Sequence, residues 1–231
     1  MQHLGYTRSS RKHDHLLQTP DTFIRAPLPG MHNATAIVHA GPTIGAGFTQ
    51  YTVEFEPGGS FTTGQSQTFL YVLEGSINSL SAHDFAYLPP AANQQVVAEG
   101  YARAVVIEKP YLPLDGAPPS AFAGQTREIV PIPLMGDDAL CVQTLIPGDR
   151  SFDFAVNLMT FQPGASLALV EIHIMEHGLM MLEGGGIYRL NDRWYPVTAG
   201  DFIYMAPYCP QWFCAVGKKP AKYLIYKDWN R

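Results

Sequence analysis

Four residues whose side chains commonly bind metal ions lie close together in the C-terminal half of the chain. Glu171, His173 and His177 occur within VEIHIMEHG, and their alternation places them on one face of a strand if that strand is regular. Two imidazoles and a carboxylate suit a divalent first-row metal, and Gln211, after the next expected hairpin, would add an amide oxygen. The sequence therefore predicts one metal site, against the simpler interpretation of two chance histidines and a solvated carboxylate.

An internal repeat defines the elements that must position these residues. Three blocks recur in the same order in both halves: EFEPGGS and TFQPGAS, FLYVLEG and GLMMLEG, DFAYLPP and DFIYMAP. The first copy is eight residues shorter between the second and third blocks, and the missing stretch corresponds roughly to 185–200. Each half is therefore expected to fold as a version of the same domain.

The runs within each copy are short, rich in Val, Ile, Tyr, Phe and Leu, and separated by Pro-Gly, Gly-Gly, Asn-Asp and Ala-Gly-Asp turns. This pattern is typical of antiparallel strands, which protect their edges by closing into a jelly-roll barrel. The predicted fold class is all-β, with two tandem barrels. Because 111–138 is rich in Pro and Gly, we place the domains at 1–125 and 126–231.

Composition narrows the class of partner. A net charge of −5 and a pI near 5.9 provide no basic face for nucleic acid or an anionic membrane, so a small soluble partner is expected. The first twenty residues lack an apolar targeting core, and no apolar run is long enough to span a bilayer. Cys141, Cys209 and Cys214 are interpreted as buried hydrophobes of a cytoplasmic protein, and His13 and His15 as part of a solvated arm.

The pattern around the candidate ligands resembles the two motifs of the cupin family. The matching positions are Gly164, Glu171-x-His173-x-x-x-His177, Gly184, Gly200 and Gln211. The chain has Glu where the first cupin His stands, His where the Glu stands and Gln where the last His stands. With these departures, and with strings such as TFLYVLEG, FDFAVNLMTFQPGAS and YLIYKDWNR, nearly the whole chain resembles the (S)-ureidoglycine aminohydrolase family of purine ureide breakdown.

This resemblance implies a bicupin, a homo-oligomer, a small ureide substrate and one Mn²⁺ per chain, although the same ligands could hold iron, nickel or zinc. It implies that Glu171 and Gln211 contact substrate as well as metal, together with Tyr223, Lys227 and, as a further candidate, Tyr188. Lys227 and Glu171 would be the acid and base that release ammonia from (S)-ureidoglycine. The simpler interpretation of Tyr223 and Lys227 is an edge strand of alternating polarity.

The repeat offsets place Thr62, Gly64, Thr68 and Gln94 at the ligand positions of the first copy. Three of these cannot replace a His or a Glu, so the first barrel is expected to be metal-free. Two other functions remain open. A cupin dioxygenase is disfavoured by the Gln ligand and Lys227, and a non-catalytic bicupin that binds a small ligand is disfavoured by four hydrophilic residues facing a barrel interior.

Overall fold

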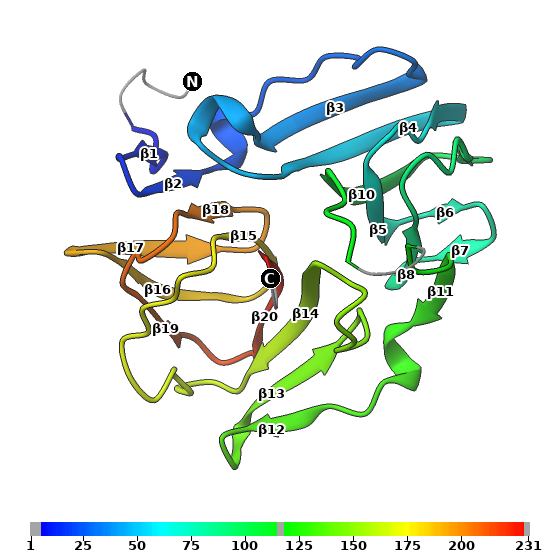
Figure 1. The fold of residues 1–231 in the computed structure, drawn as a ribbon. Helices are drawn as coiled ribbons and strands as arrows, with labels where there is room; N and C mark the ends of the chain where they lie inside the picture. Colours follow the sequence, from blue (N-terminus) through cyan, green and yellow to red (C-terminus); the bar gives the residue numbers. More distant parts are fainter. Residues whose placement is uncertain (1–5, 115–117, 229–231) are drawn as a thin grey trace. The chain divides into compact units, whose positions relative to one another are not determined.

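The computed structural model describes residues 6–114 and 118–228 and contains strands and three single-turn 3₁₀ helices in these ranges (Figure 1). The 3₁₀ helices are η1 (Pro20–Thr22), η2 (Pro42–Ile44) and η3 (Thr126–Glu128). None of the helices in these ranges is long and apolar enough to cross a bilayer. The expectation of an all-β fold is confirmed.

The N-terminal unit comprises Ile24–Ile129 and Leu145–Asp153. Its main sheet has the order β11-β8-β5-β10-β4-β3, with β9 paired to β4 and a separate β6–β7 hairpin. The bounds are β3 (His32–Ala40), β4 (Thr49–Thr62), β5 (Gln67–Glu74), β6 (Ser76–Ile77), β7 (Leu80–Ser81), β8 (Asp84–Leu88), β9 (Gln95–Val97), β10 (Ala102–Lys109) and β11 (Phe122–Gln125). Alternate residues of these strands form its buried core, among them Val53, Val72 and Val106.

The C-terminal unit comprises, within the described residues, 6–23, Val130–Thr144 and 154–228. Its sheets have the orders β1-β2-β18-β15-β20-β14-β13-β12 and β17-β16-β19, with a core cluster contributed by both. The bounds are β1 (Ser10–Arg11), β2 (His15–Gln18), β12 (Ile132–Leu134), β13 (Asp137–Thr144), β14 (Phe154–Phe161), β15 (His177–Glu183), β16 (Gly185–Leu190), β17 (Arg193–Thr198), β18 (Phe202–Met205), β19 (Gln211–Ala215) and β20 (Ala221–Asp228).

These units differ from the expected domains 1–125 and 126–231, because one segment of each expected domain belongs to the other unit. Strand β2 from the start of the chain pairs antiparallel with β18, and Leu17 is completely buried in the core of the C-terminal unit (Figure 1). The connection Leu145–Asp153 in turn belongs to the N-terminal unit. A strand added to β18 protects a sheet edge that would otherwise expose unpaired backbone groups.

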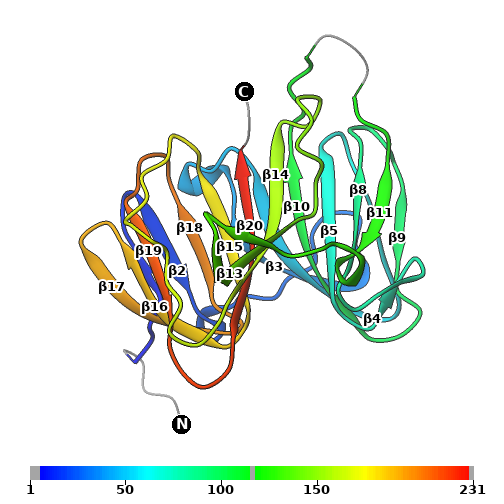
Figure 2. The same cartoon turned by 90° about the horizontal axis from the view of Figure 1, so that it is seen from below.

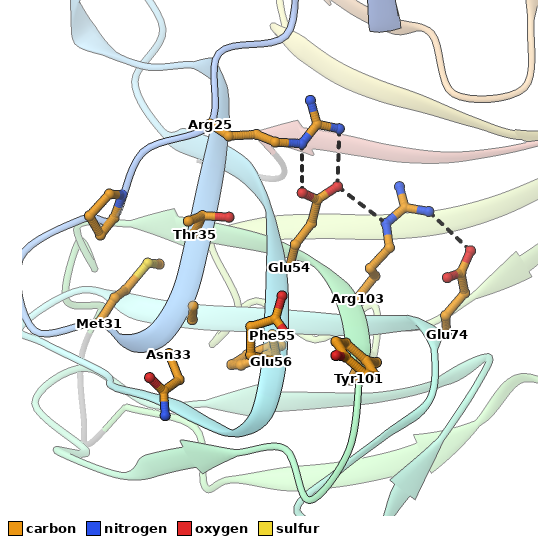
Figure 3. A pocket seen from close by; sticks show the side chains of 13 residues that line it. Arg25, Met31, Asn33, Thr35, Glu54, Phe55, Glu56, Glu74, Tyr101 and Arg103 are labelled. Carbon is orange, nitrogen blue, oxygen red and sulfur yellow. Dashed lines mark hydrogen bonds and ion pairs between the residues drawn. The ribbon is translucent and has the colours of Figure 1, made fainter.

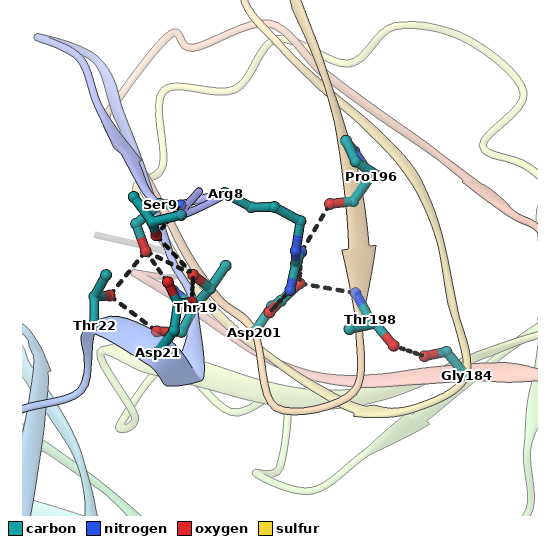
Figure 4. A network of polar contacts seen from close by, with 10 residues as sticks. Arg8, Ser9, Thr19, Asp21, Thr22, Gly184, Pro196, Thr198 and Asp201 are labelled. Atoms are coloured by element: carbon teal, nitrogen blue, oxygen red, sulfur yellow. Dashed lines mark hydrogen bonds and ion pairs between the residues drawn. The ribbon is translucent and has the colours of Figure 1, made fainter. Parts of the chain in front are cut away.

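Each unit holds one fully buried carboxylate that is paired with a cation from a distant segment. In the C-terminal unit, Arg8 donates two hydrogen bonds to Asp201, at 2.6 and 2.8 Å, and the amide of Thr198 donates a third (Figure 4). In the N-terminal unit, Lys109 donates to Asp153 at 2.9 Å, and Gln67 donates to the other oxygen of the same carboxylate. Both exchanged segments are therefore fixed by charge-assisted hydrogen bonds.

The internal repeat is confirmed strand by strand. Strand β5 lies between β8 and β10 in one unit, as β15 lies between β18 and β20 in the other (Figure 2). Gly75 and Gly184, which end the repeated LEG block, both have positive φ, and a Cβ atom at either would collide with the backbone of the facing strand. The shorter first copy is explained by its two-residue hairpin strands β6 and β7, where the second copy has six-residue strands β16 and β17.

Candidate metal centre

The candidate ligands come from two segments of the C-terminal unit that are joined by backbone hydrogen bonds. Glu171 and Gln211 form an isolated antiparallel bridge, with N–H to carbonyl distances of 2.8 and 2.9 Å in the two directions. Strand β15 begins only at His177, and 172–176 form an irregular loop. The regular strand that would carry Glu171, His173 and His177 is therefore not formed, and the backbone of Gln211 replaces it as the support for Glu171.

The structure brings some of the candidate side chains together, although the donor atoms of Glu171, His173 and His177 do not all lie within 4.8 Å of one another. The Nε2 atom of His173 is 3.1 Å from a carboxylate oxygen of Glu171, and the rings of His173 and His177 lie 5.4 Å apart and nearly perpendicular. Gln211 is buried, and its Oε1 accepts a hydrogen bond of 3.0 Å from the hydroxyl of Tyr188. This bond fixes the amide orientation and leaves the second lone pair of Oε1 available to a cation.

His177 provides the test of whether this site fits a metal. The residue is 3% exposed, and its Nδ1–H donates to the carbonyl of Tyr226 at 3.3 Å. Its Nε2 is buried and has no hydrogen-bond partner among the described residues. Burial, assisted by the neighbouring His173, lowers the pKa of His177 to about 3, so the ring is neutral and Nε2 carries a lone pair. An unpaired buried acceptor is costly, and a metal ion would satisfy it.

The proposed substrate-binding residues line the same barrel interior. Tyr188 and Tyr223 are fully buried, and burial raises the pKa of both hydroxyls, with a further contribution from the nearby Glu171. Both tyrosines therefore remain protonated and can act as hydrogen-bond donors. Lys227 lies directly opposite His177 in the pairing of β15 with β20. Tyr223 and Lys227 lie on one face of β20, opposite Met181 and His177 respectively.

Lys227 has an environment that makes proton transfer possible. The side chain is partly buried, and this burial lowers the pKa of its amine, while the charge of Glu171 opposes the shift. Lys227 also lies directly opposite His177 in the pairing of β15 with β20, so this amine comes from the strand position beside a candidate ligand.

The corresponding positions of the N-terminal unit do not form a similar centre. Thr68, which aligns with His177, is fully buried, and its hydroxyl has no hydrogen-bond partner among the described residues. Its neighbour across the β5–β10 pair is Glu108, which accepts a hydrogen bond from Tyr51. Thr62 ends β4 and Gln94 precedes β9. The set includes no imidazole.

A second cluster of metal-binding residue types was not expected from the sequence. Asp14, His15 and Cys209 form the one group, within the described ranges, whose His, Cys, Asp or Glu donor atoms all lie within 4.8 Å of one another. His15 is 2% exposed, so its interpretation as part of a solvated arm is wrong. Burial also raises the pKa of the Cys209 thiol to about 12, which makes it unreactive as a nucleophile. The two apolar residues of HLLQ, Leu16 and Leu17, are adjacent, so the sequence of this segment lacks the period-2 alternation that would have identified a strand.

A pocket on the N-terminal unit has a volume of about 740 Å³ and contains a chain of ion pairs that runs from Arg25 to Glu54, Arg103 and Glu74 (Figure 3). The Nε atom of Arg103 lies 3.7 Å from Glu54 in this chain and has no hydrogen-bond partner among the described residues. The lining includes no His or Cys, so this pocket offers no imidazole or thiol donor for a metal ion.

Comparisons with known proteins agree with this geometry. The cupin domain model matches residues 157–226, which contain all four candidate ligands. The chain is 36% identical to the (S)-ureidoglycine aminohydrolase of Arabidopsis thaliana, over 98% of this chain and 80% of that protein. It is 32% identical to the Escherichia coli protein of the same name, over 93% and 88%. The crystal structure of protein Ylba from E. coli matches with a TM-score of 0.87 and 30% identity, covering 98% of this chain and 96% of that one.

Proposed function

Because this chain belongs to the (S)-ureidoglycine aminohydrolase family of cupin proteins, we propose that it hydrolyses (S)-ureidoglycine to (S)-ureidoglycolate and ammonia with the help of one Mn²⁺ ion. The observation that carries the metal part of the proposal is the unpaired, buried Nε2 of His177 beside His173 and Glu171. The relatives named above support the substrate.

The residues that would hold the ion are Glu171, His173, His177 and Gln211. They offer two imidazole nitrogens and two oxygens, a donor set suited to Mn²⁺ and also to iron, nickel or zinc. When bound, the ion would neutralise negative charge and fix the substrate carboxylate beside the carbon that reacts. The N-terminal unit lacks this set, so one ion per chain is proposed.

The reaction breaks the bond between the substrate carbon and its amine and forms a bond between that carbon and a water oxygen. The departing nitrogen must gain a proton, and the water must lose one. Lys227 and Glu171 are the groups we propose for these transfers, because Lys227 lies opposite the proposed ligand His177 and Glu171 belongs to the same proposed site. Ammonia then leaves, and (S)-ureidoglycolate retains the hydroxyl.

The protonated hydroxyls of Tyr188 and Tyr223 would orient the substrate. Tyr188 already holds Gln211 by a 3.0 Å hydrogen bond, and Tyr223 packs against the rings of Phe161 and Phe213 in the barrel core. Rigid aromatic packing of this kind keeps a polar group in a single position, which assists orientation of a small substrate.

The deciding experiment measures ammonia release from freshly prepared ureidoglycine above its spontaneous decay. Mn²⁺-loaded protein should release ammonia without oxygen and form ureidoglycolate, and EDTA-stripped protein should not. Oxygen consumption with Fe²⁺ and no anaerobic ammonia would favour a dioxygenase, and no turnover would favour a small-ligand-binding protein. A homo-oligomer, which we also propose from the family resemblance, is checked by light scattering in solution.

A further inference from the structure

The Asp14–His15–Cys209 cluster differs from the candidate metal centre in how its polar atoms are used. The two carboxylate oxygens of Asp14 accept hydrogen bonds from His15 Nδ1, at 2.8 Å, and from Asn191 Nδ2, at 2.7 Å. Since Nδ1 of His15 carries the proton, its Nε2 accepts the hydroxyl of Tyr195 at 2.9 Å. The polar atoms of Asp14 and His15 are thus already satisfied, whereas Nε2 of His177 is not. This cluster is built to hold structure and not to receive a cation.

The network holds both ends of the loop that connects β18 to β19. The amide of Ala206, at the start of this loop, donates to the backbone carbonyl of Asp14 at 2.9 Å. The carbonyl of Pro210, at its end, accepts from the amide of Asn191 at 2.7 Å. Because the side chains of Asp14 and Asn191 are bonded to each other, the two anchors form one unit.

The same loop carries or contacts two of the candidate ligands. Gln211 directly follows Pro210, so the position of one end of the loop determines where this ligand begins. In the middle of the loop, Tyr208 has a positive φ of 64° and donates its amide to the carbonyl of His173 at 2.6 Å. A shift of the loop would therefore move Gln211 and His173 together.

We propose that Asp14, in the turn between β1 and β2, and His15, at the start of β2, are positioning residues for the metal centre and act through the Ala206–Pro210 loop. This inference rests on the metal site of the proposed function and adds residues that do not touch the ion. Partners one step removed from a metal typically change its affinity by about 10–100-fold when they are replaced. We expect a change in that range for Asp14→Ala.

The test is a titration of metal-stripped protein with Mn²⁺, with free Mn²⁺ followed by its electron paramagnetic resonance signal. Asp14→Ala should weaken Mn²⁺ binding by about 10–100-fold, and saturating Mn²⁺ should restore most of kcat. Asp14→Asn can still accept from Asn191, and can donate to His15 if the ring takes its other tautomer, so it should bind Mn²⁺ more tightly than Asp14→Ala. His13→Ala, whose side chain is 87% exposed, is the matched control and should bind as the wild type does.

A role confined to stability would lower the melting temperature and leave the Mn²⁺ affinity of the folded protein unchanged, and this result would overturn the proposal. If Asp14→Ala does not fold, Asn191→Gly decides the question. Asn191 has a φ of 55°, which Gly adopts freely, so this variant removes the side-chain link without straining the turn. Failure of the wild type to bind Mn²⁺ would instead overturn the metal site itself, together with the role of Asp14.

Discussion

The two units place different chemistry on the same backbone register. In the C-terminal unit, His177 of β15 lies between Met205 of β18 and Lys227 of β20. In the N-terminal unit, Thr68 of β5 lies between Leu88 of β8 and Glu108 of β10. The strand pairing is the same, so the difference in function is expected to come from the side chains of one cross-strand row and from the loop that supplies the other ligands.

A second contrast concerns buried imidazoles. Each unit buries one histidine whose pKa is lowered to about 3, mainly by loss of hydration: His39 in the N-terminal unit and His177 in the C-terminal unit. Nε2 of His39 lies 2.8 Å from the hydroxyl of Thr52, whereas Nε2 of His177 has no such partner among the described residues. The unsatisfied nitrogen, and not burial or a shifted pKa, therefore distinguishes the proposed ligand His177 from His39.

The largest effect on Mn²⁺ affinity and activity is expected at the cross-strand row that differs between the units, where His177 corresponds to Thr68. His177→Ala removes a proposed direct ligand, so Mn²⁺ affinity should fall by more than the roughly 100-fold seen for outer partners, and ammonia release should be lost. Thr68→Ala, at the matched position, should leave both unchanged. Metal content after dialysis and the ammonia assay measure the two outcomes, and an equal loss in both variants would contradict the comparison.

A substitution of Lys227, which lies opposite His177 in the same row, tests the proposed proton transfer. Lys227→Met should reduce the rate of ammonia release by about 10²–10⁴-fold, because it removes one of the two groups that we propose for proton transfer. Its Mn²⁺ content should remain that of the wild type. Glu108→Gln, at the matched position, should retain full activity. Loss of Mn²⁺ together with activity in Lys227→Met would assign that residue to the metal site and not to proton transfer.

The two buried carboxylates should differ in stability. Lys109→Ala leaves Asp153 charged and 1% exposed, so the free energy of unfolding should fall by about 3–5 kcal/mol. Arg8 is 37% exposed, and solvent screening reduces the expected loss for Arg8→Ala to about 1 kcal/mol. Hydrogen exchange should lose protection in β5 and β10 for the first variant and in β2 and β18 for the second. Loss in the opposite unit would contradict the assignment of these segments.

A pH dependence of stability is expected from the buried His39 of the N-terminal unit. The pKa of His39 is 6.5 in the unfolded chain and about 3 in the folded chain. Between these two pH values, only the unfolded chain binds a proton at His39. Stability therefore falls as the pH decreases through this window, by about 2 kcal/mol between pH 7 and pH 5. His39→Asn should remove this share of the loss in urea denaturation measured at both pH values. An unchanged slope would indicate that another group controls the acid sensitivity.

Much of this architecture follows from the sequence because the repeat carries it. Hairpin glycines such as Gly75 and Gly184, and the blocks around them, recur with the same backbone requirements, so the same β-fold could be predicted for both halves. The four-residue strand β2 could not be predicted, because its partner β18 lies far along the chain and HLLQ is surrounded by polar residues. The backbone pairing of Glu171 with Gln211 could not be predicted either, because an isolated bridge produces no periodic pattern in the amino-acid sequence.

The pairing of β2 with β18 has a consequence for biosynthesis. His15 leaves the ribosome roughly 190 residues before its partner Met205, so the strand must wait for almost the entire chain to be made. Contacts of such long sequence separation also slow folding, because a large loop must close before they contribute. The N-terminal unit has its strands available early, except for the Leu145–Asp153 segment. The C-terminal unit is therefore expected to be completed last, after β2 has waited for its partner β18 through most of translation.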